Sequence, residues 1–125
     1  MNEHSLIYKD EVFEIVGCAM AVLNELGCGY AEKIYENAMA VEFGNQQIPF
    51  VQQSSFDVIY KGKNVGHYVP DLVVRDEIIV ELKTIESIGK NEVAQVLNYL
   101  KGTNLKVGII LNFKHSKLEW KRIIF

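Results

Sequence analysis

The sequence of 125 residues is 49% hydrophobic and 23% charged, the composition of an ordinary globular protein. A chain of this length is expected to form a single domain over residues 1–125. Asp and Glu outnumber Lys and Arg by 16 to 13. This balance excludes a generally basic nucleic-acid coat protein, but not a local basic patch or a bound metal that recognises phosphate. Every uncharged apolar run is too short to span a bilayer, so we expect a cytoplasmic protein with no membrane contact.

Hydrophobic periodicity predicts two helices at the start of the chain. Between Tyr8 and Leu26, apolar residues recur at the i, i+3, i+4, i+7 spacing of one helix face, and Gly27 marks the end. A second helix is predicted from Ala31 to Phe43, where Gly44 and Asn45 end it.

Strand patterns dominate the rest of the chain, interrupted by one helix. Residues 106–113 are almost uniformly apolar, as expected of a strand covered on both faces. The predicted order is α-α-β-β-β-α-β-β, an α/β or α+β fold with a mixed sheet. Its strands form an antiparallel meander, and the helix then carries the chain to a parallel neighbour. The remaining predicted segments are strands at 48–60, at 65–68 continuing into 69–74, at 78–82 and at 118–125, and a helix at 92–101.

Two acids and a lysine converge at the end of a predicted hairpin. The β-branched runs on either side of residues 75–77 are typical of paired strands. If the turn centres on Asp76, Asp71 faces Glu81, with Cβ atoms about 4.5–5.5 Å apart. Lys83 follows two residues later and therefore shares this face. The sequence predicts a chemical site here.

Acids this close raise one another's pKa unless a cation lies between them. Oxygen ligands favour a hard ion, so Mg²⁺ or Mn²⁺ is expected rather than zinc. Lys83 could orient or deprotonate an attacking water, or stabilise charge on phosphorus, and each role fits phosphodiester hydrolysis. The alternative is a cross-strand ion-pair network on a solvated face. Against it, Glu81 and Lys83 interrupt an apolar strand, where unpaired charge is costly.

Three motifs in order resemble a known superfamily of nucleases. Pro70-Asp71, nine intervening residues and then Glu81-Leu82-Lys83 resemble the PD-(D/E)xK signature. Residues 95–99 (QVLNY) resemble the QxxxY element of several of its branches. Residues 29–35 (GYAEKIY) are similar to the defining pattern of the GxxExxY protein family, a small branch of that superfamily. The resemblance implies a restriction-endonuclease-like αβββαβ core with an extra N-terminal helix and a C-terminal strand.

The resemblance also implies a set of metal ligands. Asp71 and Glu81 would bind the ion, with the Leu82 carbonyl as a further ligand. A helical acid often completes such sites, and Glu32 is the candidate because it is the acid of the GxxExxY motif. Glu36 lies one helical turn later on a similar face and is the alternative.

Three further residues receive roles from the same resemblance. Lys83 would be the catalytic lysine. Gln95 and Tyr99 lie four residues apart on one helix face and would hold a phosphate or the lysine.

The function expected from the residues and the resemblance is a Mg²⁺- or Mn²⁺-dependent nuclease acting on nucleic acid, with DNA favoured. One alternative is a non-catalytic nucleic-acid-binding or assembly module that keeps the nuclease fold. A third is a hydrolase acting on a small phosphorylated molecule. A homodimer is also considered, because one small nuclease domain cuts one strand at a time.

Overall fold

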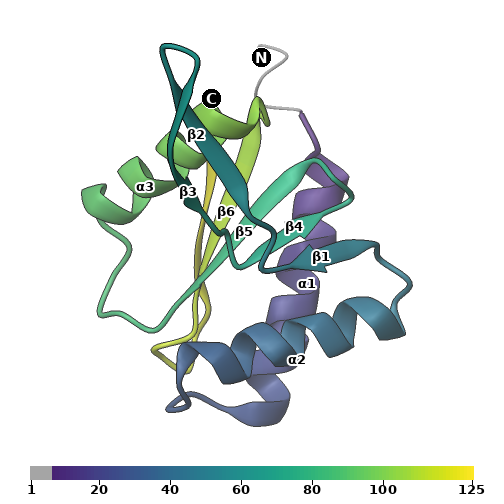
Figure 1. Ribbon diagram of the computed structural model, residues 1–125. Coiled ribbons are helices and arrows are strands. Elements are labelled where there is room, and N and C mark those ends of the chain that lie inside the picture. Colours follow the sequence, from purple (N-terminus) through teal and green to yellow (C-terminus); the bar gives the residue numbers. More distant parts are fainter. Residues whose placement is uncertain (1–6) are drawn as a thin grey trace.

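In the computed structural model, which describes residues 7–125, helices cover both faces of a mixed sheet (Figure 1). Five strands form this sheet in the order β1-β4-β5-β6-β7, and β2 and β3 form a separate two-stranded sheet. The predicted mixed α/β fold is therefore confirmed. The elements in chain order are α1 (Lys9–Leu26), α2 (Glu32–Asn45), β1 (Phe50–Gln52), β2 (Phe56–Tyr60), β3 (Lys63–Tyr68), β4 (Leu72–Val74), β5 (Ile78–Lys83), α3 (Lys90–Thr103), β6 (Val107–Asn112) and β7 (Glu119–Ile124).

Strand β5 lies at the centre of the five-stranded sheet. It pairs antiparallel with β4 and parallel with β6, as the predicted crossover through a helix requires. Strand β6 is buried along its whole length, which confirms that it is covered on both faces. Gly108 lets α3 approach β6 closely, because a Cβ atom there would lie 2.5 Å from Val96 Cγ1.

The two faces of β5 belong to different hydrophobic cores. Val80 and Leu82 pack in the larger core, which the sheet shares with α1 and α2. Ile79 packs in the smaller core beneath α3. Because side chains alternate along a strand, Glu81 and Lys83 share the α3 face with Ile79. The charged residues of β5 therefore point toward α3.

The register of the β4–β5 hairpin matches the prediction. Leu72 faces Val80, so the turn is centred on Asp76. Asp71 directly precedes β4, and the next facing pair of this ladder is Asp71 with Glu81. The fold thus places the two acids at the same end of the hairpin.

The predicted continuous meander is wrong. Strand β1 pairs with β4, whereas β2 and β3 pair only with each other within residues 7–125. The physical reason lies at Gln53, whose φ of 58° is left-handed and turns the chain out of the sheet directly after β1. Residues 56–68 consequently form a hairpin that stands away from the sheet (Figure 1). We call this hairpin the arm.

Candidate active site

Asp71 and Glu81 are neighbours where β4 begins and β5 nears its end. Asp71 Oδ2 accepts a 2.9 Å hydrogen bond from the backbone N–H of Leu82, which fixes this carboxylate against β5. Glu81 is only 5% exposed, and its Oε1 has no hydrogen-bond partner. Burial, followed by the charge and hydrogen bond of Asp71, raises the pKa of Glu81 to about 9, against the lowering effect of Lys83. Glu81 is therefore protonated at neutral pH unless a cation binds.

Helix α3 holds Lys83 on the same face. Lys83 Nζ donates a 3.2 Å hydrogen bond to Gln95 Oε1, and Gln95 Nε2 donates one of 2.9 Å to the hydroxyl of Tyr99. Burial raises the pKa of Tyr99, and the negative charges of Glu81 and Asp71 raise it further. The structure thus brings together the two acids, the lysine, and the Gln and Tyr of α3.

The two candidate helical acids reach different ends of the site. Glu32 Oε2 accepts a 3.2 Å hydrogen bond from the backbone N–H of Thr84, one residue beyond Lys83. Among the described residues, no hydrogen bond or ion pair joins Glu32 to Asp71 or Glu81. Glu32 therefore sits beside the exit of β5 rather than beside the acid pair.

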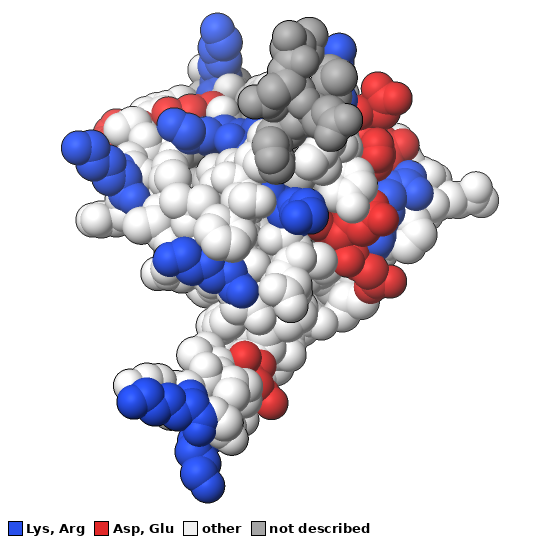
Figure 2. All heavy atoms as spheres, turned by 90° about the horizontal axis from the view of Figure 1, so that it is seen from above, with Lys and Arg blue, Asp and Glu red and all other residues white. Residues whose placement is uncertain are grey.

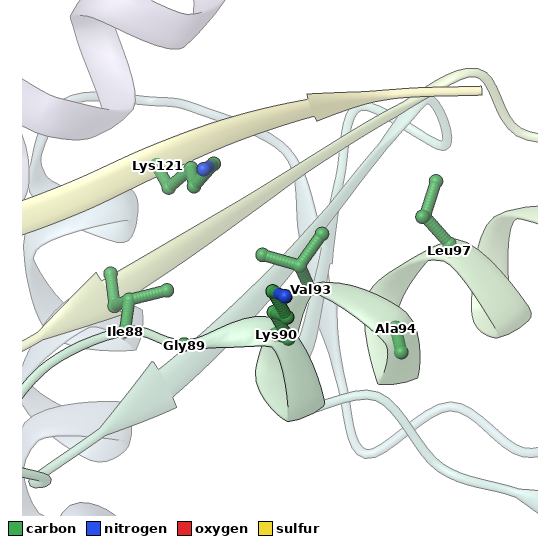
Figure 3. Close-up of a pocket in the computed structure, with 7 residues that line it drawn as sticks. All are labelled: Ile88, Gly89, Lys90, Val93, Ala94, Leu97 and Lys121. Carbon is green, nitrogen blue, oxygen red and sulfur yellow. The ribbon is translucent and has the colours of Figure 1, made fainter.

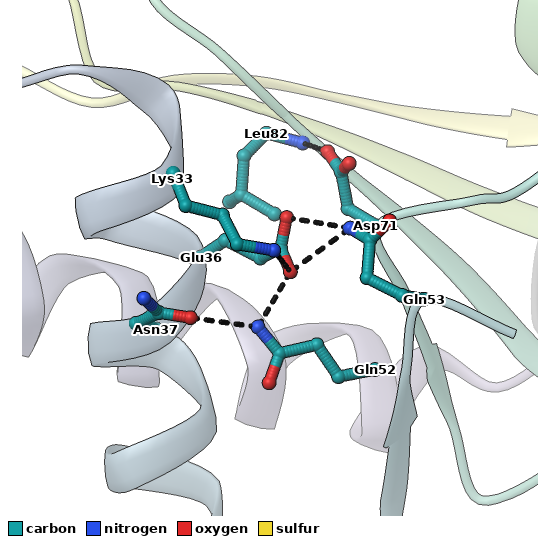
Figure 4. Close-up of polar contacts among 7 residues, drawn as sticks. All are labelled: Lys33, Glu36, Asn37, Gln52, Gln53, Asp71 and Leu82. Atoms are coloured by element: carbon teal, nitrogen blue, oxygen red, sulfur yellow. Dashed lines mark hydrogen bonds and ion pairs between the residues drawn. The ribbon is translucent and has the colours of Figure 1, made fainter.

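Glu36 lies on the side of Asp71 (Figure 4). Its buried carboxylate accepts hydrogen bonds from the side chains of Gln52 (2.5 Å) and Gln53 (2.9 and 3.0 Å), and pairs with Lys33 at 3.0 Å. The backbone N–H of Gln53 in turn donates to the carbonyl of Asp71 at 3.0 Å. Burial raises the pKa of Glu36, but these three donors outweigh burial and hold the pKa below its usual value. Glu36 thus supports the backbone at Asp71 through Gln53.

Two positioning contacts were not predicted from the sequence. Asn112, buried at the end of β6, exchanges hydrogen bonds with the backbone of Ile85 and so fixes the loop after Lys83. Its signal in the sequence was a polar residue that ends an apolar strand. Tyr68 of the arm stacks on Tyr99 with ring centroids 4.5 Å apart. Nothing local in the sequence links these two tyrosines.

The acid pair suits a hard divalent cation. Both residues offer carboxylate oxygens, and the unpartnered Oε1 of buried Glu81 is an atom that a cation would satisfy. Within residues 7–125, no group of three or more His, Cys, Asp or Glu side chains is arranged to hold a metal. Mg²⁺ usually keeps several waters and binds through one or two carboxylates, so a two-carboxylate site fits that ion.

Comparison with known proteins identifies the class. The family model of the PD-(D/E)XK nuclease superfamily matches residues 9–123, and the chain belongs to this superfamily. Its nucleases generally use divalent metal ions and act on nucleic acid. The sequence resemblance to the superfamily is thereby confirmed. In the part of the chain that the structure describes, no helix has the length and apolar character needed to cross a membrane.

The solved structure of SSO0001 has a similar fold. It aligns with a TM-score of 0.59 at 18% identity, covering 95% of this chain and 60% of that one. The present chain therefore spans about three fifths of that protein. No curated protein matches the sequence.

Proposed function

We propose that this protein is a metal-dependent nuclease of the GxxExxY branch, which hydrolyses phosphodiester bonds in nucleic acid, with DNA as the favoured substrate. The observation that carries the proposal is the environment of Glu81. This residue is a buried acid with an unpartnered oxygen, beside a second acid and a lysine that α3 holds. Strongly perturbed acids of this kind gather at catalytic sites. Residues 29–35 support the assignment to the branch.

In this proposal Asp71 and Glu81 hold Mg²⁺ or Mn²⁺, and the Leu82 carbonyl is a further ligand. Glu32 remains the proposed helical acid, although its contact with Thr84 holds it at the end of β5 and not beside the acid pair. When bound, the ion lowers the pKa of an attacking water and neutralises phosphate charge. Glu81 would hold the ion in its deprotonated form, because a cation would replace the proton as the partner of its oxygen.

Lys83 is the proposed catalytic lysine. Its ammonium group is directed by Gln95, so it can donate to a phosphate oxygen or orient a water on the acid side of the site. Tyr99 holds the Gln95 side chain from the other end. Gln95 and Tyr99 therefore position the lysine, and each keeps hydrogen-bonding capacity for a phosphate.

A cleavage assay tests the proposal. Purified protein is incubated with DNA and RNA in Mg²⁺ or Mn²⁺, and the expected products carry 5′-phosphate and 3′-hydroxyl ends. Lys83→Ala should lower the rate by about 10²–10⁴-fold. Lys117→Ala removes an exposed lysine from the turn between β6 and β7, and should leave the rate unchanged. Equal cleavage by wild type and Lys83→Ala would contradict the assignment.

The second candidate is a non-catalytic module that binds nucleic acid and keeps the nuclease fold. The observation that favours it is that no third His, Cys, Asp or Glu joins the acid pair within residues 7–125. Titration calorimetry with Mg²⁺ separates the two. Metal binding that Asp71→Asn abolishes supports the nuclease, whereas tight nucleic-acid binding without metal supports the module.

A further inference from the structure

The arm projects from the body of the protein (Figure 1), and several of its large apolar side chains are exposed. Ile59, Tyr60 and Val65 are each more than half exposed, at 60%, 53% and 61%. Ile59 and Tyr60 point to opposite faces of the hairpin, because side chains alternate along a strand, so the arm exposes apolar groups on both faces. Lys61 and Lys63 stand at or beside the turn of the same hairpin, and Lys61 Nζ lies 5.4 Å from the centre of the Tyr60 ring.

The base of the arm is fixed firmly to α3. The Tyr68 hydroxyl donates a 2.9 Å hydrogen bond to the backbone carbonyl of Tyr99, and the two rings stack almost parallel, at 4°. Phe56 also stacks on Tyr68, with centroids 5.9 Å apart. Gly102 is required beneath this contact, because a Cβ atom there would lie 2.5 Å from the Tyr68 hydroxyl. The arm is therefore held at a fixed position over α3.

A cleft of about 430 Å³ lies between the arm and α3. Val58 provides an apolar wall, Tyr68 and Tyr99 provide aromatic edges, and Asn98 and Lys101 provide hydrogen-bond donors. Among the described residues, none of those that line the cleft is an acid. Apolar and aromatic contacts beside cationic groups are the chemistry with which proteins hold a single nucleic-acid strand.

The charge distribution complements phosphate at this place. Lys101 lines the cleft, Lys61 and Lys63 lie at the turn of the arm, and Asp57 is the only acid in the arm. The chain as a whole has a net charge of −3. Figure 2 shows Lys or Arg side chains next to an acidic group on a projecting part of the molecule, while other acidic side chains gather on another side of this view. Local positive charge on an acidic protein can select where a polyanion binds.

Tyr99 joins the cleft to the proposed active site. One side of this residue lines the cleft, and its hydroxyl accepts the hydrogen bond from Gln95, which in turn holds Lys83. We propose that the cleft between the arm and α3 binds the nucleic-acid strand next to the scissile phosphate. A base lies against Val58 and the tyrosine edges, and phosphates lie near the lysines. This inference rests on the proposed nuclease function.

A second groove on α3 supplies a matched control. Lys90 and Lys121 line it together with the apolar residues Ile88, Val93 and Leu97 (Figure 3). Lys90 is separated from Lys101 by about 16 Å along the helix. The double variant Lys90→Ala/Lys121→Ala therefore removes the same charge as Lys61→Ala/Lys63→Ala, at a different place.

The experiment measures fluorescence anisotropy of a labelled single-stranded DNA and the matching duplex, in EDTA to prevent cleavage, over a series of salt concentrations. Lys61→Ala/Lys63→Ala should weaken binding and reduce the salt slope by about two, one for each lost phosphate contact. Val58→Asp places an acid in the cleft wall and should weaken binding by about tenfold or more. The control pair should leave the slope unchanged. Circular dichroism confirms that each variant is folded.

The outcomes separate this inference from the proposed function. Two results would overturn the cleft inference in a protein that cleaves DNA: arm variants that bind DNA like wild type, or a control pair that loses as much affinity as the arm pair. The proposed nuclease function would stand in either case. If the arm variants alone lose binding and neither wild type nor Lys83→Ala cleaves, the cleft stands as a binding site and the nuclease fails. Absence of binding by wild type overturns the inference. A dimer in sedimentation velocity that Val58→Asp dissociates also overturns it, because the arm then binds a second copy.

Discussion

Two glutamates of this protein are almost equally buried and yet have opposite pKa shifts. Glu36 is 4% exposed and Glu81 is 5% exposed. Burial raises the pKa of both carboxyl groups. The pKa of Glu36 nevertheless falls below its usual value, whereas that of Glu81 rises to about 9. Burial is therefore outweighed at Glu36, whereas at Glu81 it is the largest cause of the raised pKa.

The neighbours account for the opposite directions of the two pKa shifts. Glu36 receives hydrogen bonds from two glutamines and an ion pair from a lysine, which stabilise its charged form. Glu81 faces a second acid, Asp71, and keeps one oxygen without a partner. A buried carboxylate with donors is a structural group, whereas one without donors needs a proton or a cation. Under the proposed function, this contrast assigns Glu81 as a metal ligand and Glu36 as a supporting residue.

The largest expected effect is on activity. Glu81→Gln should lower kcat/KM by on the order of 10³-fold, because several kcal/mol of metal-ion stabilisation are lost. Glu36→Gln should lower it by less than about tenfold, since Glu36 acts on Asp71 only through Gln53. Both values are measured by DNA cleavage at a fixed Mg²⁺ concentration. Equal losses of kcat/KM in the two variants would contradict the difference between the two glutamates. They would assign Glu36 as the helical metal ligand in place of Glu32.

The free energy of unfolding should be affected in the opposite order, with a larger loss for Glu36→Gln than for Glu81→Gln. Glu36→Gln should reduce the free energy of unfolding by about 1–3 kcal/mol, because an amide in place of the carboxylate leaves buried donors without acceptors. Glu81→Gln should not destabilise the metal-free protein at pH 8, since the amide removes a group that must otherwise be protonated or charged without a partner. Urea denaturation in EDTA measures both. A larger loss for Glu81→Gln would show that Glu81 is structural.

The pH dependence gives a smaller and more specific effect. The pKa of Glu81 is about 9 in the folded protein and 4.5 as its ordinary value. The folded state therefore binds one more proton between these pH values, and its stability falls as pH rises from about 5 to 9, by at most about 1.4 kcal/mol per pH unit. Glu36 acts in the opposite sense, because its lowered pKa adds stability that is lost only as pH falls below 4.5.

Denaturation in EDTA at pH 6, 7, 8 and 9 tests this dependence. Glu81→Gln should flatten the profile in this range, while Glu36→Gln should keep the slope and lower the whole curve. Added Mg²⁺ should increase the free energy of unfolding most at the highest pH, where the ion no longer competes with a proton for Glu81. A wild-type profile as flat as that of Glu81→Gln would disprove the raised pKa.

What the sequence could predict depended on local signals. The β-branched runs on either side of Asp76 set the register that faces Asp71 with Glu81, because a short turn leaves the two strands little choice of pairing. The uniformly apolar β6 likewise predicted a buried neighbour. The roles of these site residues stay predictions until the variants are measured.

The features that the sequence could not predict depend on contacts between residues far apart in the chain. Periodicity could not separate Glu36 from Glu32, because the two glutamines that donate to Glu36 lie 16 and 17 residues away on the chain. The departure of the arm from the sheet depended on one left-handed residue, Gln53, whose type does not demand that conformation. A sequence pattern predicts which residues share an element, but the environment of a buried charge is set by the elements packed against it.

The smallest effect that we predict concerns Tyr99. Tyr99→Phe removes the hydroxyl that accepts from Gln95 but keeps the ring that stacks on Tyr68. Stability should fall by only about 0.5–1.5 kcal/mol, the net value of one hydrogen bond. Cleavage should fall a few-fold, because Lys83 keeps its contact with Gln95 but Gln95 loses its fixed orientation. Tyr60→Phe, on the exposed arm, is the matched control and should change stability by less than about 0.5 kcal/mol.

The slope of stability with pH should be the same in Tyr99→Phe as in wild type, since the raised pKa of Glu81 is attributed to burial and Asp71 and not to this hydroxyl. A flattened slope in Tyr99→Phe would instead make the tyrosine part of the environment that keeps Glu81 protonated.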